Sequence, residues 1–204
     1  KNIKNTTLQK NGSLAVVLLQ SGTSCSYRAR PKNDNNPQNG QKGPPGASQI
    51  TKIMILTSQS LENPLRLLAF CVHANEQLIL CKGLSTDEEP DLWQKELHGT
   101  ISHWIDLGQL DEKRIKKACG LAEQVTLYPY TDRRVGVWWE QIKKKLVRFK
   151  NLSVITVNDE ALESLAGLAQ RSMQIQCAIE DNEIWLTSNS DSVHIVLKHL
   201  KQAR

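Results

Sequence analysis

Residues 102–130, SHWIDLGQLDEKRIKKACGLAEQVTLYPY, decide the fold of this chain. Residues 102–108 and 124–130 are rich in β-branched and aromatic side chains, which predicts two strands. Residues 111–120 lie between them, with acids in the first turn, basic residues after the acids and a glycine at the end. That order complements a helix dipole and stops a helix. The stretch therefore predicts a strand, a helix and a strand, as in a mixed α/β domain.

The flanking sequence extends this pattern in both directions. Apolar residues at helical spacing run from Val135 to Phe149, and Lys143, Lys144 and Arg148 lie on the opposite face. Further expected elements are helices at 65–73 and 159–168, strands at 77–84 and 152–157, a short polar-aromatic turn or helix at 91–97, and antiparallel strands around 175–179, 184–186 and 193–197. We expect an α/β (α+β) domain in which helices flank a mixed β-sheet and antiparallel strands close the chain.

Residues 1–60 differ in composition from the rest. The net charge is +5, yet residues 1–50 hold seven lysines and arginines against one acid, which leaves residues 51–204 at −1. Residues 32–48 (KNDNNPQNGQKGPPGAS) have no apolar periodicity, so we expect a loop or disorder there. We divide the chain into an atypical, partly disordered segment at 1–60 and a folded domain at 61–204. The near-neutral domain gives no electrostatic argument for a nucleic-acid partner.

Several classes of protein are excluded by composition and motif. The apolar run at residues 14–19 (LAVVLL) is shorter than the roughly 20 residues that span a bilayer, so we expect no membrane partner. The five cysteines are scattered, without the Cys/His spacing of a zinc site. The chain also lacks a phosphate-binding glycine loop and the motif of a nucleophilic serine.

Two aspartates are candidates for a metal-dependent active site. Asp91 ends an acidic run after a proline, and Asp106 lies fifteen residues later inside a predicted strand. Converging carboxylates can hold Mg²⁺, whose bound water can attack a phosphodiester. A lysine from the next helix, Lys117 or Lys113, could orient that water or stabilise the charge on the phosphate. The layout approximates a P-D…(D/E)-x-K nuclease motif, with Gly108 standing where the lysine belongs.

A purely structural interpretation of the charged residues stays open. Acidic runs and basic helix faces usually meet solvent and have no further role. Trp138 and Trp139 could stack on bases, although helical spacing favours a core position for Trp138. Residues 143–145 with Arg148 and Lys150 could contact phosphates, or could form a solvated helix face.

Six blocks of sequence occur in a distinctive order. They are RLLAF (66–70), KGLSTDEEPDLWQ (82–94), WIDLGQLDEKRIKKACG (104–120), VWWEQ (137–141), NLSV (151–154) and IEDNEIWLTS (179–188). From about Arg66 to the C-terminus, this order resembles the YaeQ family of small bacterial cytoplasmic proteins. The resemblance implies a cytoplasmic location and a core similar to the PD-(D/E)XK nucleases.

The resemblance also implies a site. It makes Asp91 and Asp106 metal ligands, with Gln109 orienting the metal and Lys117 positioning water or stabilising the phosphorane. Mg²⁺ is the implied cofactor and nucleic acid the implied partner, while the oligomeric state is left undefined. The leading prediction is a Mg²⁺-dependent, nuclease-like site that acts on nucleic acid. The alternative is a non-catalytic binding or regulatory protein that keeps the nuclease-like fold.

This sequence departs from the family pattern at the site and at the N-terminus. Position 106 is Asp, where the family usually has Glu. Residues 57–62 (TSQSLE) lack the acidic pattern of the family's first helix, and residues 1–56 show no family-like strands. We therefore expect that residues 1–60 do not match the family. A site that lacks one wall would favour the non-catalytic alternative.

Overall fold

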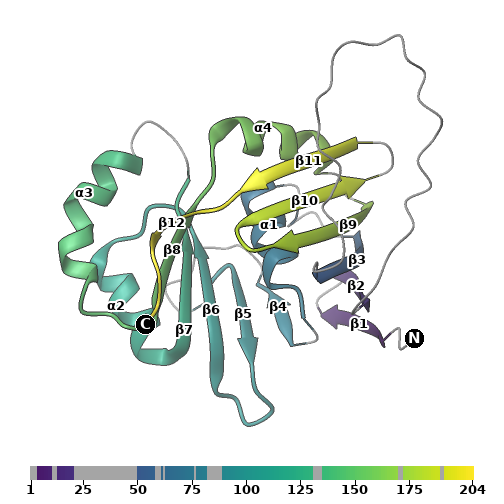
Figure 1. Ribbon diagram of the computed structural model, residues 1–204. Coiled ribbons are helices and arrows are strands. Elements are labelled where there is room, and N and C mark those ends of the chain that lie inside the picture. Colours follow the sequence, from purple (N-terminus) through teal and green to yellow (C-terminus); the bar gives the residue numbers. More distant parts are fainter. Residues whose placement is uncertain are drawn as a thin grey trace.

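The computed structural model describes the backbone of residues 4–10, 13–20, 50–57 and 172. It describes backbone and side chains of residues 61, 63–75, 77–81, 89–130, 135–169, 173–188 and 191–204. The strands form two six-stranded sheets, with helices on the outer face of one sheet and between the two (Figure 1). The expected α+β architecture with a mixed sheet is confirmed.

One sheet, called here the mixed sheet, has the strand order β12-β8-β7-β6-β5-β4. Its strands are β4 (Leu78–Leu80), β5 (Leu92–Lys95), β6 (Ile101–Leu107), β7 (Ala122–Tyr128), β8 (Leu152–Thr156) and β12 (Lys198–Lys201). β6, β7 and β8 are parallel neighbours, and the other pairings are antiparallel. Because parallel neighbours need a crossover, helices connect them.

The two crossover helices are α2 (Glu112–Leu121) and α3 (Val135–Leu146), and both cover one face of the mixed sheet. Asp111 caps α2, since its carboxylate accepts a hydrogen bond from the backbone N–H of Arg114 at 2.7 Å. Ile115 and Ala118 of α2 are fully buried against the sheet. The strand-helix-strand pattern expected for residues 102–130 is therefore confirmed.

The other sheet is antiparallel throughout, in the order β1-β2-β3-β9-β10-β11. Its strands are β1 (Lys4–Lys10), β2 (Ser13–Gln20), β3 (Ile50–Thr57), β9 (Ser172–Glu180), β10 (Glu183–Ser188) and β11 (Asp191–Val196). Helix α1 (Pro64–His73) contacts both β6 and β9, and α4 (Asp159–Leu168) contacts α1 and β11, so the main core lies between the sheets. Among the described residues, no helix is long and apolar enough to cross a membrane.

Two expectations about secondary structure are wrong. The turn or helix expected at 91–97 is strand β5, because buried Leu92 pairs with Ile105 and the ladder with β6 overrides the polar local composition. Strands were not expected in residues 1–56, yet β1, β2 and most of β3 lie there and join the sheet through β9. The loop expected at 32–48 lies outside the described residues.

Candidate functional site

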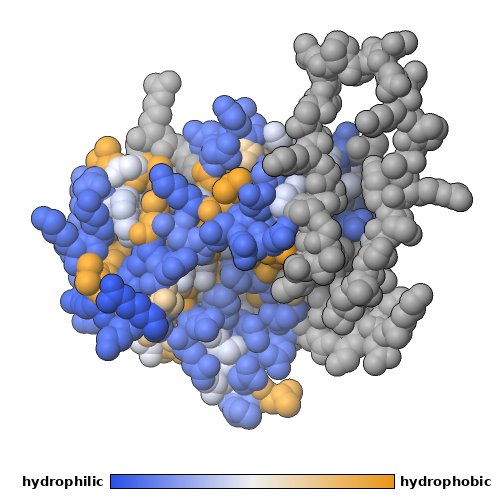
Figure 2. Space-filling model, viewed as in Figure 1, coloured by the Kyte–Doolittle hydropathy of each residue, from blue (hydrophilic) through white to orange (hydrophobic). Residues whose placement is uncertain are grey.

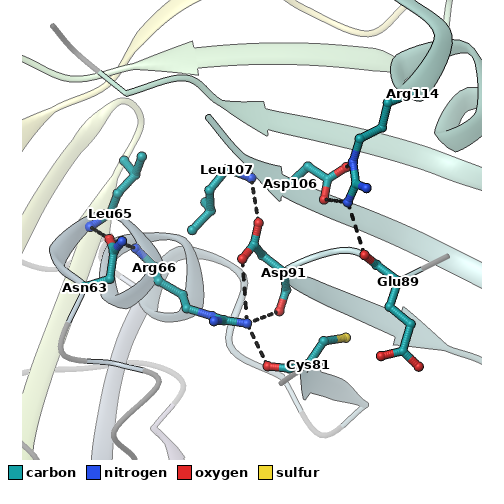
Figure 3. A network of polar contacts seen from close by, with 9 residues as sticks. All are labelled: Asn63, Leu65, Arg66, Cys81, Glu89, Asp91, Asp106, Leu107 and Arg114. Atoms are coloured by element: carbon teal, nitrogen blue, oxygen red, sulfur yellow. Dashed lines mark hydrogen bonds and ion pairs between the residues drawn. The ribbon is translucent and has the colours of Figure 1, made fainter. Parts of the chain in front are cut away.

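The two candidate aspartates lie side by side at one end of the mixed sheet. Asp91 immediately precedes β5, and Asp106 is the penultimate residue of β6. The antiparallel register pairs Leu92 with Ile105, which places the two acids at the next position of each strand. The backbone N–H of Leu107 donates to the Asp91 carboxylate at 3.0 Å (Figure 3). The sequence prediction that Asp91 and Asp106 lie near each other is therefore supported by the geometry.

Asp106 is almost completely buried, with 1% of its surface exposed. The guanidinium of Arg114 donates to both carboxylate oxygens, through Nη2 to Oδ1 at 2.9 Å and through Nε to Oδ2 at 3.1 Å. The indole N–H of Trp104 also donates to Oδ2, at 2.8 Å. This two-point pairing is the strongest geometry for an arginine and a carboxylate, and it neutralises the buried charge.

Arg114 is positioned by its place in the first turn of α2. The cap at Asp111 fixes the start of the helix, so Arg114 is directed toward the end of β6. Its Nη2 also donates to the backbone carbonyl of Glu89 at 3.1 Å. The same guanidinium thus connects α2, β6 and the segment that leads into β5 (Figure 3).

Asp91 is less completely enclosed than Asp106. Desolvation raises the pKa of the Asp91 carboxyl, and the neighbouring Asp106 adds to the rise. The hydrogen bond from Leu107 N–H and the positive charges of Arg66 and Arg114 act in the opposite direction but do not cancel it. The Arg66 guanidinium lies 3.7 Å from Asp91 Oδ1.

Arg66 is the second arginine of the site, and it comes from the opposite face of the mixed sheet. It lies in α1 between buried leucines and is only 6% exposed. The start of α1 is fixed by Asn63, whose side chain accepts from the N–H groups of Leu65 and Arg66. Arg66 Nη2 donates to the carbonyls of Cys81 at 2.7 Å and Asp91 at 2.8 Å, which joins α1 to β4 and β5.

The other predicted site residues lie beside this network in different roles. The side-chain amide of Gln109 donates to the carbonyl of Tyr130 at 2.7 Å, which ties together the segments that follow β6 and β7. Lys117 is exposed on α2, one helical turn beyond Arg114. Arg114, not a lysine, contacts Asp106.

Gly108, where the nuclease motif has lysine, is required by the backbone. Its φ is +96°, which L-residues with a side chain rarely adopt. A Cβ built there would lie 3.1 Å from Cε2 of Tyr130. Because a lysine at this position would be both strained and crowded, glycine here reflects the turn after β6.

Whether the two aspartates suit a magnesium ion depends on what already contacts their carboxylate oxygens. Mg²⁺ is bound through carboxylate oxygens and water, and a guanidinium already at those oxygens repels a second cation. Each oxygen of the two aspartates faces an N–H group or a guanidinium, and two arginines balance the two acids. Within the described ranges, no group of three or more His, Cys, Asp or Glu side chains could hold a metal. The arrangement does not fit Mg²⁺, whose binding stays an untested prediction.

Sequence reasoning missed the two arginines. From the sequence, Arg114 was identified only as one of the basic residues of the predicted helix at 111–120, and Arg66 only as part of the RLLAF block. The signal for Arg66 was present, since an arginine within an apolar helix is buried only when it is paired. For Arg114, the clue was its spacing from Asp111, which puts it in the capped first turn beside the end of β6.

Comparisons with known proteins show the family. The model of the YaeQ protein family matches residues 60–197. The chain is 41% identical to the YaeQ proteins of Escherichia coli K12 and Salmonella typhi over 138 residues, 68% of this chain and 76% of each of theirs.

Solved structures agree with the sequence match. The crystal structure of YaeQ from Xanthomonas axonopodis pv. citri has a TM-score of 0.66 at 35% identity, covering 71% of this chain and 81% of that one. YaeQ from Pseudomonas syringae has a TM-score of 0.64 at 29% identity, covering 74% and 85%. The resemblance expected from about Arg66 onward is confirmed, and the chain belongs to the YaeQ family.

Proposed function

We propose that this protein is a non-catalytic binding protein built on a PD-(D/E)XK nuclease-like fold. One observation carries the proposal: the guanidinium of Arg114 occupies both oxygens of Asp106, the buried acid of the pair. A metal-dependent nuclease needs those oxygens for its cation. Here they stabilise the junction of α2 and β6.

The position of Arg66 supports the same conclusion. Its Nη2 donates to two backbone carbonyls and lies near Asp91, so α1, β4 and β5 meet at one guanidinium. Moving either arginine to admit a cation would leave a buried charge without its partner, which typically costs about 3–5 kcal/mol. The network therefore favours a permanent structural role for the two aspartates over reversible binding of a metal ion.

A Mg²⁺-dependent nuclease is the second candidate. The adjacency of Asp91 and Asp106 favours it, because two carboxylates at the ends of neighbouring strands are a common cation-binding geometry. In that alternative, substrate or metal would displace the arginines, and Gln109 and Lys117 would act as the family resemblance implies.

Calorimetric titration with MgCl₂ and MnCl₂ separates the two candidates. We expect the protein to show no saturable binding that depends on the acids, and no Mg²⁺-dependent cleavage of labelled single- or double-stranded substrates. Two matched variants are compared with the parent protein. Asp91→Asn/Asp106→Asn removes both acids, and Arg114→Gln removes only the positive charge of the guanidinium. Saturable binding by the parent protein that the double variant loses would overturn the proposal.

The Arg114→Gln variant sharpens the test. If the guanidinium excludes the ion, this variant should gain Mn²⁺ affinity that the parent lacks, because both oxygens of Asp106 lose their positive partner. Circular dichroism and urea unfolding of each variant would show that the samples compared are folded.

A further inference from the structure

A groove borders the far end of the mixed sheet, between the end of α3 and the last strand. Its volume is about 760 Å³. The walls come from one side of α3 between Trp139 and Lys144, the turn at residues 147–150 and the residues from Leu200 to Arg204. The backbone N–H of Arg204 donates to the carbonyl of Lys150 at 2.8 Å, so the end of the chain lies against that turn (Figure 1).

The groove has an unusual charge. Six of its twelve lining residues are basic and none is acidic; the basic ones are Lys143, Lys144, Arg148, Lys150, Lys201 and Arg204. Residues 51–204 as a whole carry a net charge of −1. The positive charge is therefore concentrated locally on a nearly neutral domain. Such a basic patch is typical of a binding site for an anionic ligand.

The basic residues of the groove fall into two groups. Lys143 pairs with Glu140 at 2.6 Å and Arg148 with Glu112 at 2.6 Å, while Lys201 Nζ donates to the carbonyls of Phe149 and Leu152. Of these, Lys201 joins β12 to the turn after α3, while Lys143 and Arg148 are already paired with acids. Among the described residues, the exposed side chains of Lys144, Lys150 and Arg204 make no hydrogen bond or ion pair, so their charges are available to a ligand.

Aromatic side chains form part of the same surface. Trp139 and Phe149 line the groove and are partly exposed while they pack on the core beneath α3. Planar rings beside cations suit single-stranded nucleic acid, whose bases stack on aromatic rings while its phosphates meet lysines. Figure 2 shows this side of the molecule as a hydrophilic surface with hydrophobic patches.

The groove and the acidic pair lie at opposite ends of the strands. Asp106 is near the C-terminal end of β6, whereas Lys150 precedes the N-terminal end of β8, and β6, β7 and β8 run parallel. A strand bound in the groove would thus be recognised away from the two aspartates, as expected of a protein that binds without cleaving.

We infer that this groove binds the phosphates and bases of single-stranded nucleic acid, with Lys144 and Lys150 as phosphate contacts. The inference rests on the proposed function, because it names the ligand of a non-catalytic binding protein. A free polyphosphate offers the same anionic chemistry without bases, so the experiment separates the two sources.

Fluorescence anisotropy with a labelled oligothymidylate of about 12 nucleotides, in EDTA, is the test. The variant Lys144→Gln/Lys150→Gln removes two phosphate contacts, and Lys116→Gln/Lys198→Gln is the control, with the same change of charge on exposed positions of α2 and β12 outside the groove. At about 0.1 M salt, we expect the groove variant to bind about 25-fold more weakly, with its salt slope reduced by about 1.4. The control should stay within about twofold of the parent.

Three outcomes would overturn the inference. Absence of binding by the folded parent protein at low salt, or equal losses in the two lysine variants, would show that the groove is not the binding site. Binding of tripolyphosphate that depends on Lys144 and Lys150, without oligonucleotide binding, would assign the groove to a small anion. In a separate incubation with MgCl₂ in place of EDTA, cleavage of the oligonucleotide would refute the proposed function and leave the groove result intact.

Discussion

The two ends of the mixed sheet carry charge in opposite ways. At one end, Asp91 and Asp106 are enclosed, and each faces an arginine. At the other, Lys144 and Lys150 are exposed, and no described residue pairs with their side chains. The nuclease-like motif points to the acidic end as the site, but the partners of those charges point to the basic end.

The difference teaches which charges are available for function. Each member of a buried ion pair has lost its hydration and is stabilised by its partner instead. If one member binds a ligand, the other becomes an uncompensated buried charge, which is energetically costly. An exposed lysine keeps its hydration and releases counterions when a phosphate arrives. Substitutions at the acidic end should therefore change stability, and substitutions in the groove should change binding.

The largest effect is expected for Arg114→Met. The variant leaves the Asp106 carboxylate, which is 1% exposed, without its positive partner. We expect the free energy of unfolding to fall by about 3–5 kcal/mol. Urea denaturation followed by circular dichroism measures the change.

The control for that variant is Asp106→Asn/Arg114→Met. Asparagine removes the buried charge and can still accept the hydrogen bond from Trp104. Most of the lost stability should return, because no uncompensated ion remains. If the double variant is as unstable as Arg114→Met, the charge of Asp106 is not the cause and the comparison between the two ends fails.

A smaller effect is expected for Arg66→Met. The substitution keeps an apolar chain among the buried leucines of α1 but leaves the carbonyls of Cys81 and Asp91 without this donor. Because two carbonyl groups lose a hydrogen-bond donor and one ion pair is lost, the free energy of unfolding should fall by about 2–3 kcal/mol. Hydrogen exchange would locate the damage: faster exchange confined to α1, β4 and β5 supports the role of Arg66, and uniform acceleration argues against it.

The pH dependence of stability tests the environment of Asp91. Burial raises the pKa of this carboxyl above 3.8 in the folded protein, so the folded state binds the proton more tightly than the unfolded chain. The contribution of Asp91 to stability is present at low pH and is lost as the pH rises through the raised pKa. The unfolding free energy of the parent minus that of Asp91→Asn should therefore fall across this window.

A direct titration of Asp91 checks the cause. The ¹³Cγ chemical shift should give a midpoint above 3.8, and Arg66→Met should move it higher, since the guanidinium lowers this pKa. A midpoint below 3.8 would mean that Arg66 and the Leu107 N–H outweigh desolvation.

Periodicity predicted the regular elements well where local pattern and tertiary packing agree. The crossover of residues 102–130 is such a case, because Ile115 and Ala118 repeat at helical spacing and Asp111 supplies the cap. Strand β5 was missed because residues 91–97 have the polar and aromatic composition of a turn or short helix, while the hydrogen bonds that make it a strand come from β6. Strand β3 was missed because its partner β9 lies more than 100 positions away in the chain, whereas β1 and β2 pair locally as a hairpin and reach the sheet only through β3.

The candidate site was only half predictable. The sequence identified Asp91 and Asp106 and placed them near each other through their spacing and the family resemblance. It did not predict the arginine partners, because Arg66 is contributed by a helix on the other side of the sheet and is 25 positions from Asp91. The groove could not be predicted from the sequence either, because Lys150 and Leu200 come together only when β12 pairs with β8.

The smallest effect on stability is expected in the groove. Lys144→Gln/Lys150→Gln removes two exposed charges without a described partner, so the free energy of unfolding should change by no more than about 0.5 kcal/mol. Relief of repulsion among neighbouring lysines could even make the change favourable. Urea denaturation measures this on the same samples used for binding. A loss above 2 kcal/mol, in about the range expected for the arginine variants, would give these lysines a structural role and erase the contrast between the two ends. A small change together with a large loss of oligonucleotide affinity would establish that contrast, because the same substitution would then separate recognition from folding.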